Sequence, residues 1–323
     1  MKALAKGLIA VALVTSATVI TITTFNVAMA QEGAGDVVYV PTPQVVVDTM
    51  LTMAKVGPSD YVIDLGSGDG RMVITAAKKF GARGFGVDLD QVLLKLSNEN
   101  AKQAGVTDRA QFFDRNIFET DLKQATVITT YLLPSMNERL RPAILDLKPG
   151  TRVVAHDYHM GEWQPDEHER LSVPEKVVGN PGVSYIYLWY VPARVAGRWR
   201  SEVPLSPAAG ATAVPYDFNL TQIFQKIDGS VRVGSQDMKM LGAELRGDQI
   251  SFTALSGRID DKNTVRRDFR GKVNGDTITG TVRIEGGGSS RTVPWNAKLT
   301  QRGEMKQGAA DTPAPAVRSA VAR

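Results

Sequence analysis

Apolar residues in the first half of the chain alternate between short continuous runs and helical periodicity. The runs with the length and composition of buried strands are 61–65, 84–87, 110–113, 125–132, 151–155 and 183–191. Between them, helical spacing of apolar residues predicts helices over 71–80, 91–104 and 135–147. Short strands separated by helices predict a doubly wound α/β domain over 36–191, with its ligand edge at the carboxyl ends of the parallel strands.

The second half of the chain has a different pattern. Residues 192–215 are rich in Pro, Ala and Gly, which predicts a linker. Short alternating segments then follow one another, separated by turn signals, and the stretches 245–251 and 273–279 each predict a hairpin with Gly-Asp at its tip. We therefore expect a small antiparallel all-β sandwich or barrel over 216–302, followed by an Ala/Pro-rich disordered tail over 303–323.

The first thirty residues stand apart from both domains. Lys2 and Lys6 precede a long apolar stretch that ends in Ala28-Met29-Ala30, which is the pattern of a secretory signal peptide. A periplasmic or extracellular protein is therefore expected. If residues 1–30 are retained, they anchor the protein in the membrane with the same topology. Translation from Met29 would instead give a cytoplasmic protein.

Composition narrows the classes of function. Of the 323 residues, 43% are hydrophobic and 22% charged, which excludes disordered and fibrous proteins. The net charge is only +4 and no long basic run occurs, so no nucleic-acid partner is expected. The lack of cysteine excludes disulfides, thiolate metal sites and Cys nucleophiles. For the three histidines, His156, His159 and His168, we expect local hydrogen bonding and predict no metal site.

The most informative stretch is VIDLGSGDGR at 62–71. Three glycines at every second position follow a buried strand and precede a helix, and Asp88 ends the next strand. A carboxylate at that point can accept hydrogen bonds from both hydroxyls of a ribose. An adenosine-type ligand is therefore expected, against the structural alternative of a tight strand-to-helix turn with no ligand.

The charges of this loop select among adenosine ligands. Arg71 stands where the dinucleotide pattern has its third glycine, and a pyrophosphate would be repelled by Asp64 before the loop and Asp69 within it. A ligand that carries an ammonium and a sulfonium would be attracted, and S-adenosylmethionine (SAM) carries both. The GxxxxGK[ST] motif is absent, which leaves a nucleotide triphosphate site unsupported.

The loop resembles motif I of the seven-stranded, Rossmann-like SAM-dependent methyltransferases, and the resemblance extends over residues 36–191. It implies that Asp64 holds the methionine amino group, that the glycines admit the methionine part and that Asp88 binds the ribose. The cofactor-binding residues expected on this basis are Asp64, Gly66, Ser67, Gly68, Asp69, Gly70, Asp88, Asn116 and Ile117. Asn116 stands where the class usually has Asp, so Asp114 is an alternative partner for the adenine edge.

A narrower resemblance is carried by separated blocks in a shared order. The blocks are YVPTP at 39–43, DLGSGDGR at 64–71, FETDL at 118–122, YLLP at 131–134 and PGTRVV at 149–154. They resemble the small family of mitochondrial lysine methyltransferases that modify the adenine nucleotide translocase and the c-ring protein of ATP synthase. The resemblance implies methyl transfer to an amine of a protein lysine, although that family lacks the β-rich domain.

Three features at the ligand edge are candidates for handling the acceptor. Tyr131 and Pro134 end the fourth strand, where many amine methyltransferases carry an aromatic residue and a proline, and a tyrosine can orient an amine by its hydroxyl or by cation–π contact. Asp157 after the fifth strand is a candidate substrate-side carboxylate or base. Residues 39–43 are expected to form a lid over the cofactor. The structural alternatives are a packed strand end for Tyr131, a helix-starting proline for Pro134, a hydrogen-bonded turn for Asp157 and a rigid arm for residues 39–43.

Three functions remain open from the sequence. The first is a SAM-dependent methyltransferase for a protein lysine, and the second is a methyltransferase for a small molecule, such as an amine or a quinone-like compound. The third is a non-catalytic binding protein that keeps the fold outside the cytoplasm. The export signal bears on all three, because SAM is made in the cytosol and an exported enzyme would need a supply.

Overall fold

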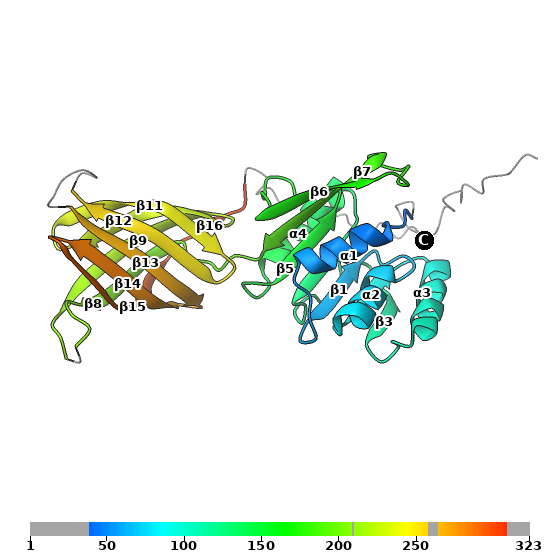
Figure 1. The fold of residues 1–323 in the computed structure, drawn as a ribbon, viewed down its shortest axis with the longest axis horizontal. Coiled ribbons are helices and arrows are strands. Elements are labelled where there is room, and N and C mark those ends of the chain that lie inside the picture. The colour runs from blue at the N-terminus through cyan, green and yellow to red at the C-terminus, as the bar shows by residue number, and fades with distance from the viewer. Residues whose placement is uncertain (1–38, 209, 258–263, 309–323) are drawn as a thin grey trace, which may run out of the picture.

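The computed structural model describes residues 39–208, 210–257 and 264–308, which form two domains joined end to end (Figure 1). The N-terminal domain is built from α1 (Gln44–Met53), β1 (Tyr61–Leu65), α2 (Arg71–Phe80), β2 (Arg83–Asp88), α3 (Gln91–Ala104), β3 (Ala110–Asp114), β4 (Val127–Thr130), α4 (Pro134–Leu145), β5 (Arg152–His156), β6 (Glu167–Val173) and β7 (Gly182–Tyr190). The predicted α/β class is confirmed. The predicted leader 1–30 and most of the predicted tail lie outside the described residues.

Seven strands of this domain form one mixed sheet in the order β3-β2-β1-β4-β5-β7-β6. β1 pairs in parallel with β2 on one side and with β4 on the other, so the strand order reverses between β1 and β4. β7 runs antiparallel to both β5 and β6. In open α/β sheets, ligands bind at the carboxyl ends of the strands where such a reversal occurs.

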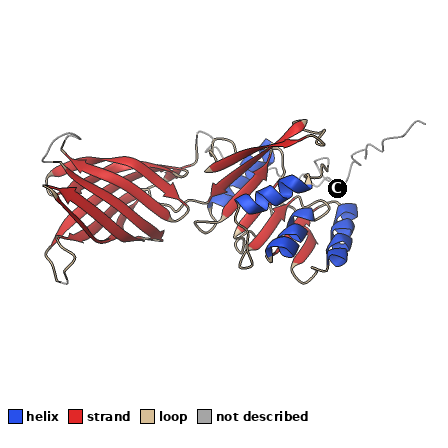
Figure 2. Ribbon diagram, viewed as in Figure 1, coloured by secondary structure: helices blue, strands red, loops and turns tan. Residues whose placement is uncertain are grey.

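Helices cover both faces of the sheet (Figure 2). Val62 and Val154 are buried against α1 and α2, whereas Ile63 and Val153 are buried against α4 on the opposite face. Because successive residues of a strand point to opposite faces, a strand covered on both sides is a continuous apolar run. None of the helices in the described part of the chain is long and apolar enough to cross a membrane.

Two elements of this domain are not predicted by the sequence pattern. α1 contains three consecutive valines, whose branched side chains lower helix propensity. Its Val46, Val47 and Met50 are nevertheless completely buried, so packing on the sheet stabilises the helix. β6 has the largely polar sequence EHERLSV and is a strand because it pairs along its whole length with β7 at the edge of the sheet.

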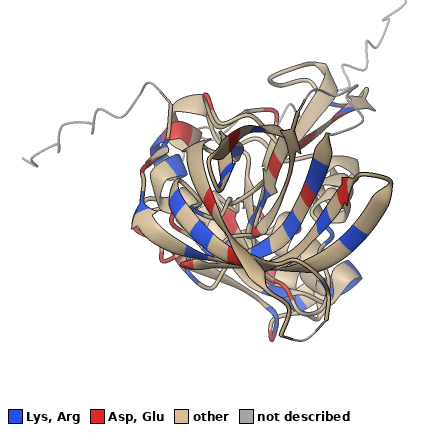
Figure 3. Ribbon diagram, turned by 90° about the vertical axis from the view of Figure 1, so that its left-hand side faces the viewer, with Lys and Arg blue, Asp and Glu red and all other residues tan. Residues whose placement is uncertain are grey.

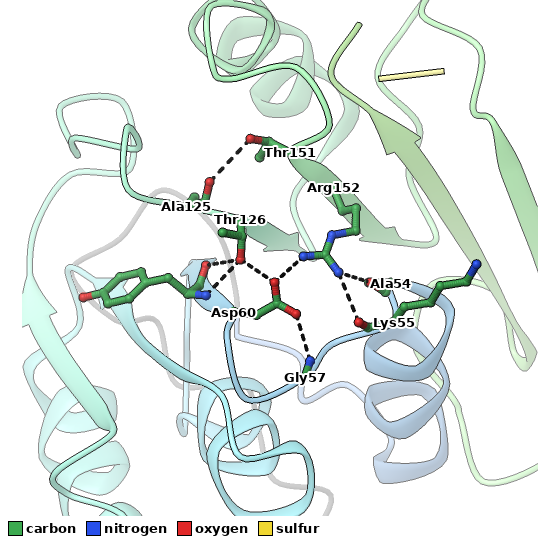
Figure 4. Close-up of polar contacts among 9 residues, drawn as sticks. Ala54, Lys55, Gly57, Asp60, Ala125, Thr126, Thr151 and Arg152 are labelled. Atoms are coloured by element: carbon green, nitrogen blue, oxygen red, sulfur yellow. Dashed lines mark hydrogen bonds and ion pairs between the residues drawn. The ribbon is translucent and has the colours of Figure 1, made fainter. Parts of the chain in front are cut away.

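A buried ion pair holds the amino ends of the central strands together, opposite the ligand edge (Figure 4). The Arg152 guanidinium pairs with Asp60 and donates to the Ala54 carbonyl oxygen, 2.7 Å away, at the end of α1. Asp60 also accepts hydrogen bonds from the Thr126 hydroxyl and the Gly57 N–H, both at 2.8 Å. This network ties α1, β1, β4 and β5 into one rigid support for the ligand edge.

The C-terminal domain is a closed antiparallel barrel of eight strands. Its strands are β8 (Gly197–Pro204), β9 (Ala213–Ile223), β10 (Lys226–Val233), β11 (Gln236–Arg246), β12 (Gln249–Ser256), β13 (Val265–Asn274), β14 (Thr277–Gly286) and β15 (Ser289–Arg302). Each strand pairs with the next along the chain, and β15 pairs with β8 to close the barrel. Of the two predicted alternatives, the domain is the barrel, and both predicted Gly-Asp hairpins are present between β11 and β12 and between β13 and β14.

Two predicted boundaries of this domain are corrected by the structure. The predicted linker 192–215 contains β8 and the start of β9. In β8, Trp199, Ser201 and Val203 point inward and are buried, and this period of two is the strand signal that the Pro, Ala and Gly content obscured. The predicted tail contains β16 (Met305–Lys306), which pairs in parallel with β9 because Met305 is buried between the domains.

The tip of the β9–β10 hairpin joins the two domains. Phe224 adopts a left-handed backbone conformation with a φ of 52° and stacks on Trp163, with ring centroids 6.2 Å apart. The Arg141 guanidinium lies 5.5 Å from the Phe224 ring centroid, and Gln225 Oε1 accepts a 2.9 Å hydrogen bond from the Trp163 indole N–H. Phe224 and Met305 thus complete the apolar core of the N-terminal domain.

Candidate functional site

A pocket opens at the carboxyl ends of β1 and β4, where the strand order reverses. Of the residues predicted to hold the cofactor, the pocket is lined by Asp64, Gly66, Ser67, Asp69, Asp88, Asn116 and Ile117, and the predicted acceptor residue Tyr131 joins them. The arm before α1 contributes Tyr39, Val40, Pro41 and Thr42 to the same lining. The two remaining glycines, Pro134 and Asp157 lie outside it.

Gly68 and Gly70 shape the loop from behind the pocket. Both have positive φ, at 53° and 80°, a conformation that glycine adopts without strain. A Cβ at Gly68 would lie 2.3 Å from Cε2 of the Tyr39 ring, and a Cβ at Gly70 would lie 2.5 Å from Cζ of the Phe112 ring. These glycines therefore let the loop pack against Tyr39 on one side and against β3 on the other.

Asp64 is the most perturbed carboxyl group of the pocket. Burial, and secondarily the neighbouring charges of Asp88 and Asp69, raises its pKa from 3.8 to about 7. A 2.5 Å hydrogen bond from the Thr129 hydroxyl opposes this shift. A buried carboxyl with a pKa near neutrality ionises readily when a cation is placed beside it.

Asp69 is already paired within the protein. The Arg71 guanidinium donates to it through Nε at 2.9 Å and Nη2 at 2.5 Å, and its Nη1 donates to the Thr42 carbonyl oxygen at 2.6 Å. Burial and the Asp69 charge raise the pKa of Tyr39 to about 12, so its hydroxyl stays protonated and donates to Asp69. Arg71 therefore compensates the charge by which Asp69 was expected to repel a pyrophosphate, and it also fastens the arm to the loop.

Asp88 and Asn116, which were expected to contact an adenosine, both line the pocket. Asp88 is fixed by the Gly68 N–H on Oδ2 at 2.9 Å and the Leu89 N–H on Oδ1 at 2.8 Å. The Asn116 side-chain oxygen accepts from the Phe118 N–H at 3.0 Å. Of the two alternatives for the adenine edge, Asn116 lines the pocket, whereas Asp114 accepts a hydrogen bond from Gln91 outside it.

Two hydroxyl groups in the pocket lack partners. Ser67 Oγ and Thr130 Oγ1 are buried and make no hydrogen bond with the described part of the protein, and both residues line the pocket. Buried polar atoms are nearly always satisfied, so an unpartnered pair of hydroxyls on residues that line one cavity indicates a ligand with polar atoms. The polar groups of the pocket, two carboxylates, an amide and two hydroxyls, fit an adenosyl ligand that carries an ammonium group.

Tyr131, the predicted acceptor residue, belongs to an aromatic cluster beside the pocket. The Tyr131 ring lies 4.0 Å from the His156 ring and 6.0 Å from the Tyr158 ring, measured between centroids. Burial lowers the pKa of His156 to about 4, which keeps this imidazole neutral. Its ring nitrogens lie 2.9 Å from the Ser184 hydroxyl and 3.3 Å from the Thr42 hydroxyl, so the arm also reaches this side.

Asp157 lies behind Tyr131, away from the pocket lining. Its Oδ2 is 3.5 Å from the Tyr131 hydroxyl and forms a buried ion pair with Lys176, and its Oδ1 accepts from the Tyr185 N–H at 3.0 Å. Both carboxylate oxygens are thus occupied, which does not suit the predicted role of base. Pro134 begins α4. Sequence reasoning missed Lys176, because the turn between β6 and β7 carries no motif.

Two of the three histidines have the local hydrogen bonds that were expected of them. His156 is completely buried within hydrogen-bonding distance of two hydroxyls, and His159 Nδ1 accepts from the Gly161 N–H at 3.1 Å. Across the described residues, no group of three or more His, Cys, Asp or Glu side chains could hold a metal ion.

Comparison with known proteins matches the N-terminal domain. The family described as ANTKMT methyltransferase domain matches residues 64–167. The protein-lysine N-methyltransferase of Saccharolobus islandicus (strain REY15A) is 47% identical over 131 residues, which are 40% of this chain and 81% of the relative. The adenine nucleotide translocase lysine N-methyltransferase of Mus musculus is 30% identical over 121 residues, which are 37% of this chain and 52% of the relative.

A solved structure is also similar in sequence. It is described as an RNA methyltransferase from Salinibacter ruber in complex with S-adenosyl-L-homocysteine. It is 46% identical to this chain, with a TM-score of 0.44, and the match covers 48% of this chain and 96% of the other.

Proposed function

Because the chain belongs to the ANTKMT methyltransferase family, we propose that it is a SAM-dependent methyltransferase whose acceptor is the side-chain amine of a protein lysine. SAM supplies a methyl group that is already activated by a sulfonium sulfur. The protein must therefore bind the cofactor, align the amine and keep water away. The relatives named for protein lysines support this acceptor class.

In this proposal the cofactor is held by the residues that line the pocket. Asp64 accepts the methionine ammonium, which lowers its raised pKa by placing a positive charge beside it. Asp88 accepts the ribose hydroxyls, and the Asn116 side-chain amide donates to the adenine edge. The orphaned hydroxyls of Ser67 and Thr130 gain partners when the pocket is filled.

The observation that carries the acceptor proposal is the position of Tyr131. It lines the cofactor pocket and is grouped with His156 and Tyr158. Aromatic faces attract an ammonium by cation–π contact, and a neutral imidazole does not repel it. An apolar aromatic site also lowers the pKa of the arriving amine, which favours the neutral nucleophile. We assign Asp157 to positioning the Tyr131 hydroxyl.

The proposal is tested with the purified full-length protein and methyl-labelled SAM. Protein from cells that express the chain is incubated with the purified protein and the labelled SAM. The mixture is then hydrolysed and analysed for methylated amino acids. We expect label in methyl-lysine with the wild type, none with Asp64→Asn, and wild-type amounts with the exposed control Asp108→Asn. Tyr131→Phe should lower kcat while leaving SAM affinity unchanged. Label confined to small molecules would contradict the proposed acceptor, and failure to bind SAM would contradict the activity.

A further inference from the structure

The middle of the barrel is filled by aromatic side chains. The ring centroids of Phe252 and Phe269 are 4.7 Å apart, those of Phe269 and Trp295 are 5.0 Å apart, and those of Phe218 and Phe269 are 5.5 Å apart. An eight-stranded barrel is just wide enough for its side chains to fill. This layer closes the interior, so any ligand of the barrel meets it from one of its ends.

The end of the barrel that is farther from the N-terminal domain has polar inward positions, and we call it the distal mouth. The polar inward residues there are Tyr216 of β9, Ser256 of β12, Arg267 of β13 and Arg291 of β15, and the apolar Ile284 of β14 lies between the two arginines. Figure 3 looks at the molecule from this end and shows basic residues on the strands there. Such positions in a barrel interior are usually apolar, so their polarity needs a reason.

Arg267 crosses the distal mouth from one wall to the other. Its Nε donates to the Tyr216 hydroxyl at 3.1 Å on β9, and its Nη1 donates to the Ser256 hydroxyl at 3.0 Å on β12. Arg267 pairs in register with Ile284, which in turn pairs with Arg291. Residues directly opposite one another on neighbouring strands point to the same face, so both guanidinium groups belong to one inward row.

The second observation is a buried polar atom at the mouth without a partner. Arg291 Nε is buried and makes no hydrogen bond. An arginine N–H group can only donate. The mouth therefore offers a donor whose acceptor is missing among the described residues.

The carboxylates nearest in sequence do not supply that acceptor. Asp268 and Glu285 alternate with the inward residues of β13 and β14, so they lie on the outer surface. There they pair with the outward arginines Arg266 and Arg283. The Arg291 side chain makes no hydrogen bond or ion pair with any described residue, and a cation whose Nε is buried without a partner is costly.

We propose that the distal mouth of the barrel is a binding site for an oxyanion, a carboxylate or a phosphate group, held between Arg267 and Arg291. The planar guanidinium fork matches both oxyanions, and the ligand supplies the acceptor that Arg291 Nε lacks. The aromatic layer below leaves the anionic group at the mouth, with the rest of the ligand extending outward. This site is independent of the methyltransferase pocket.

The test titrates the full-length protein with inorganic phosphate and, separately, with octanoate, by calorimetry. We expect saturable binding of at least one probe, and its identity distinguishes phosphate from carboxylate as the preferred group. Arg291→Gln should weaken that binding about tenfold or more, the effect of losing one charged hydrogen bond. Because Arg291 has no partner in the described protein, this variant should fold, and Arg291→Lys provides a second variant that keeps the charge.

The matched control is Arg283→Gln. Arg283 lies on β14 near the same end, but it is exposed and points outward to Glu285. Its replacement removes the same charge and should leave the affinity at the wild-type value. The absence of saturable binding for both probes would mean that only water satisfies Arg291 Nε and would overturn the proposal. An equal loss of affinity in Arg283→Gln and Arg291→Gln would overturn it as well, since binding would then depend on net charge alone.

Discussion

Replacing Gly68 by alanine should show whether Tyr39 closes over the cofactor. The new Cβ would lie 2.3 Å from Cε2 and 2.8 Å from Cδ2 of the Tyr39 ring, so the ring would have to leave its place. Its hydroxyl would then lose the hydrogen bond to the Asp69 carboxylate, worth roughly 1.5–3 kcal/mol. Alanine at a φ of 53° adds backbone strain of roughly 1–2 kcal/mol, whether or not Tyr39 is present.

A double-mutant cycle separates these two effects. SAM affinity is measured by calorimetry for the wild type, Gly68→Ala, Tyr39→Ala and the double variant. If Tyr39 is a lid, Gly68→Ala costs roughly 10- to 100-fold more affinity in the wild type than in the Tyr39→Ala background. The control is Gly105→Ala, where φ is 69° and a Cβ would meet nothing within 4 Å, so only the strain remains. An equal loss in both backgrounds would refute the lid.

Three further predictions concern stability. The pKa of Asp64 is about 7 in the folded protein against an ordinary 3.8, so the folded state holds this proton more tightly and the cofactor-free protein loses stability as the pH rises from about 4 to 7. Asp64→Asn should abolish that loss, which is up to roughly 4 kcal/mol in urea titrations. An unchanged dependence of the free energy of unfolding on pH would contradict the raised pKa of Asp64. Lys176→Met should destabilise by roughly 3–5 kcal/mol because it leaves the Asp157 carboxylate buried without its cation, and the double variant with Asp157→Asn should recover much of this; a cost below about 1 kcal/mol would argue against a buried pair. Phe224→Ala should lower the free energy of unfolding by roughly 3–5 kcal/mol and expose Trp163, which its fluorescence reports; an unperturbed spectrum would mean that the hairpin tip does not hold the domains together.

The central sheet and the cofactor loop were predictable because their signals are local. A buried strand such as Tyr61–Leu65 is a continuous apolar run, and the helix after Gly70 has its apolar residues at helical spacing. The conformations of the loop follow from its glycines, which are needed wherever φ is positive. Asp64 and Asp88 end neighbouring strands, so parallel topology alone brings them to one edge.

The parts that could not be predicted depend on contacts between distant residues. The polarity of Asp69 in the sequence says nothing of its hydrogen bond with Tyr39, which comes from the path of the arm. Lys176 reaches Asp157 only because β7 folds back beside β5. The strands of a sandwich and of a barrel have the same alternation of apolar and polar residues. Only the pairing of β15 with β8, which are distant in the sequence, decides between the two folds.

The route of the chain through the barrel has a consequence for the order in which the protein matures. The chain leaves the N-terminal domain near Ala196 and returns at Gly303, whose N–H donates to the Ala196 carbonyl oxygen at 2.9 Å. Two side chains of the first domain's core, Phe224 and Met305, are synthesised long after the sheet that they cover. A nascent chain that has completed only the methyltransferase sheet therefore carries an uncovered Trp163 face. The apolar core of the first domain is therefore complete only once the strands that carry these two side chains have been made.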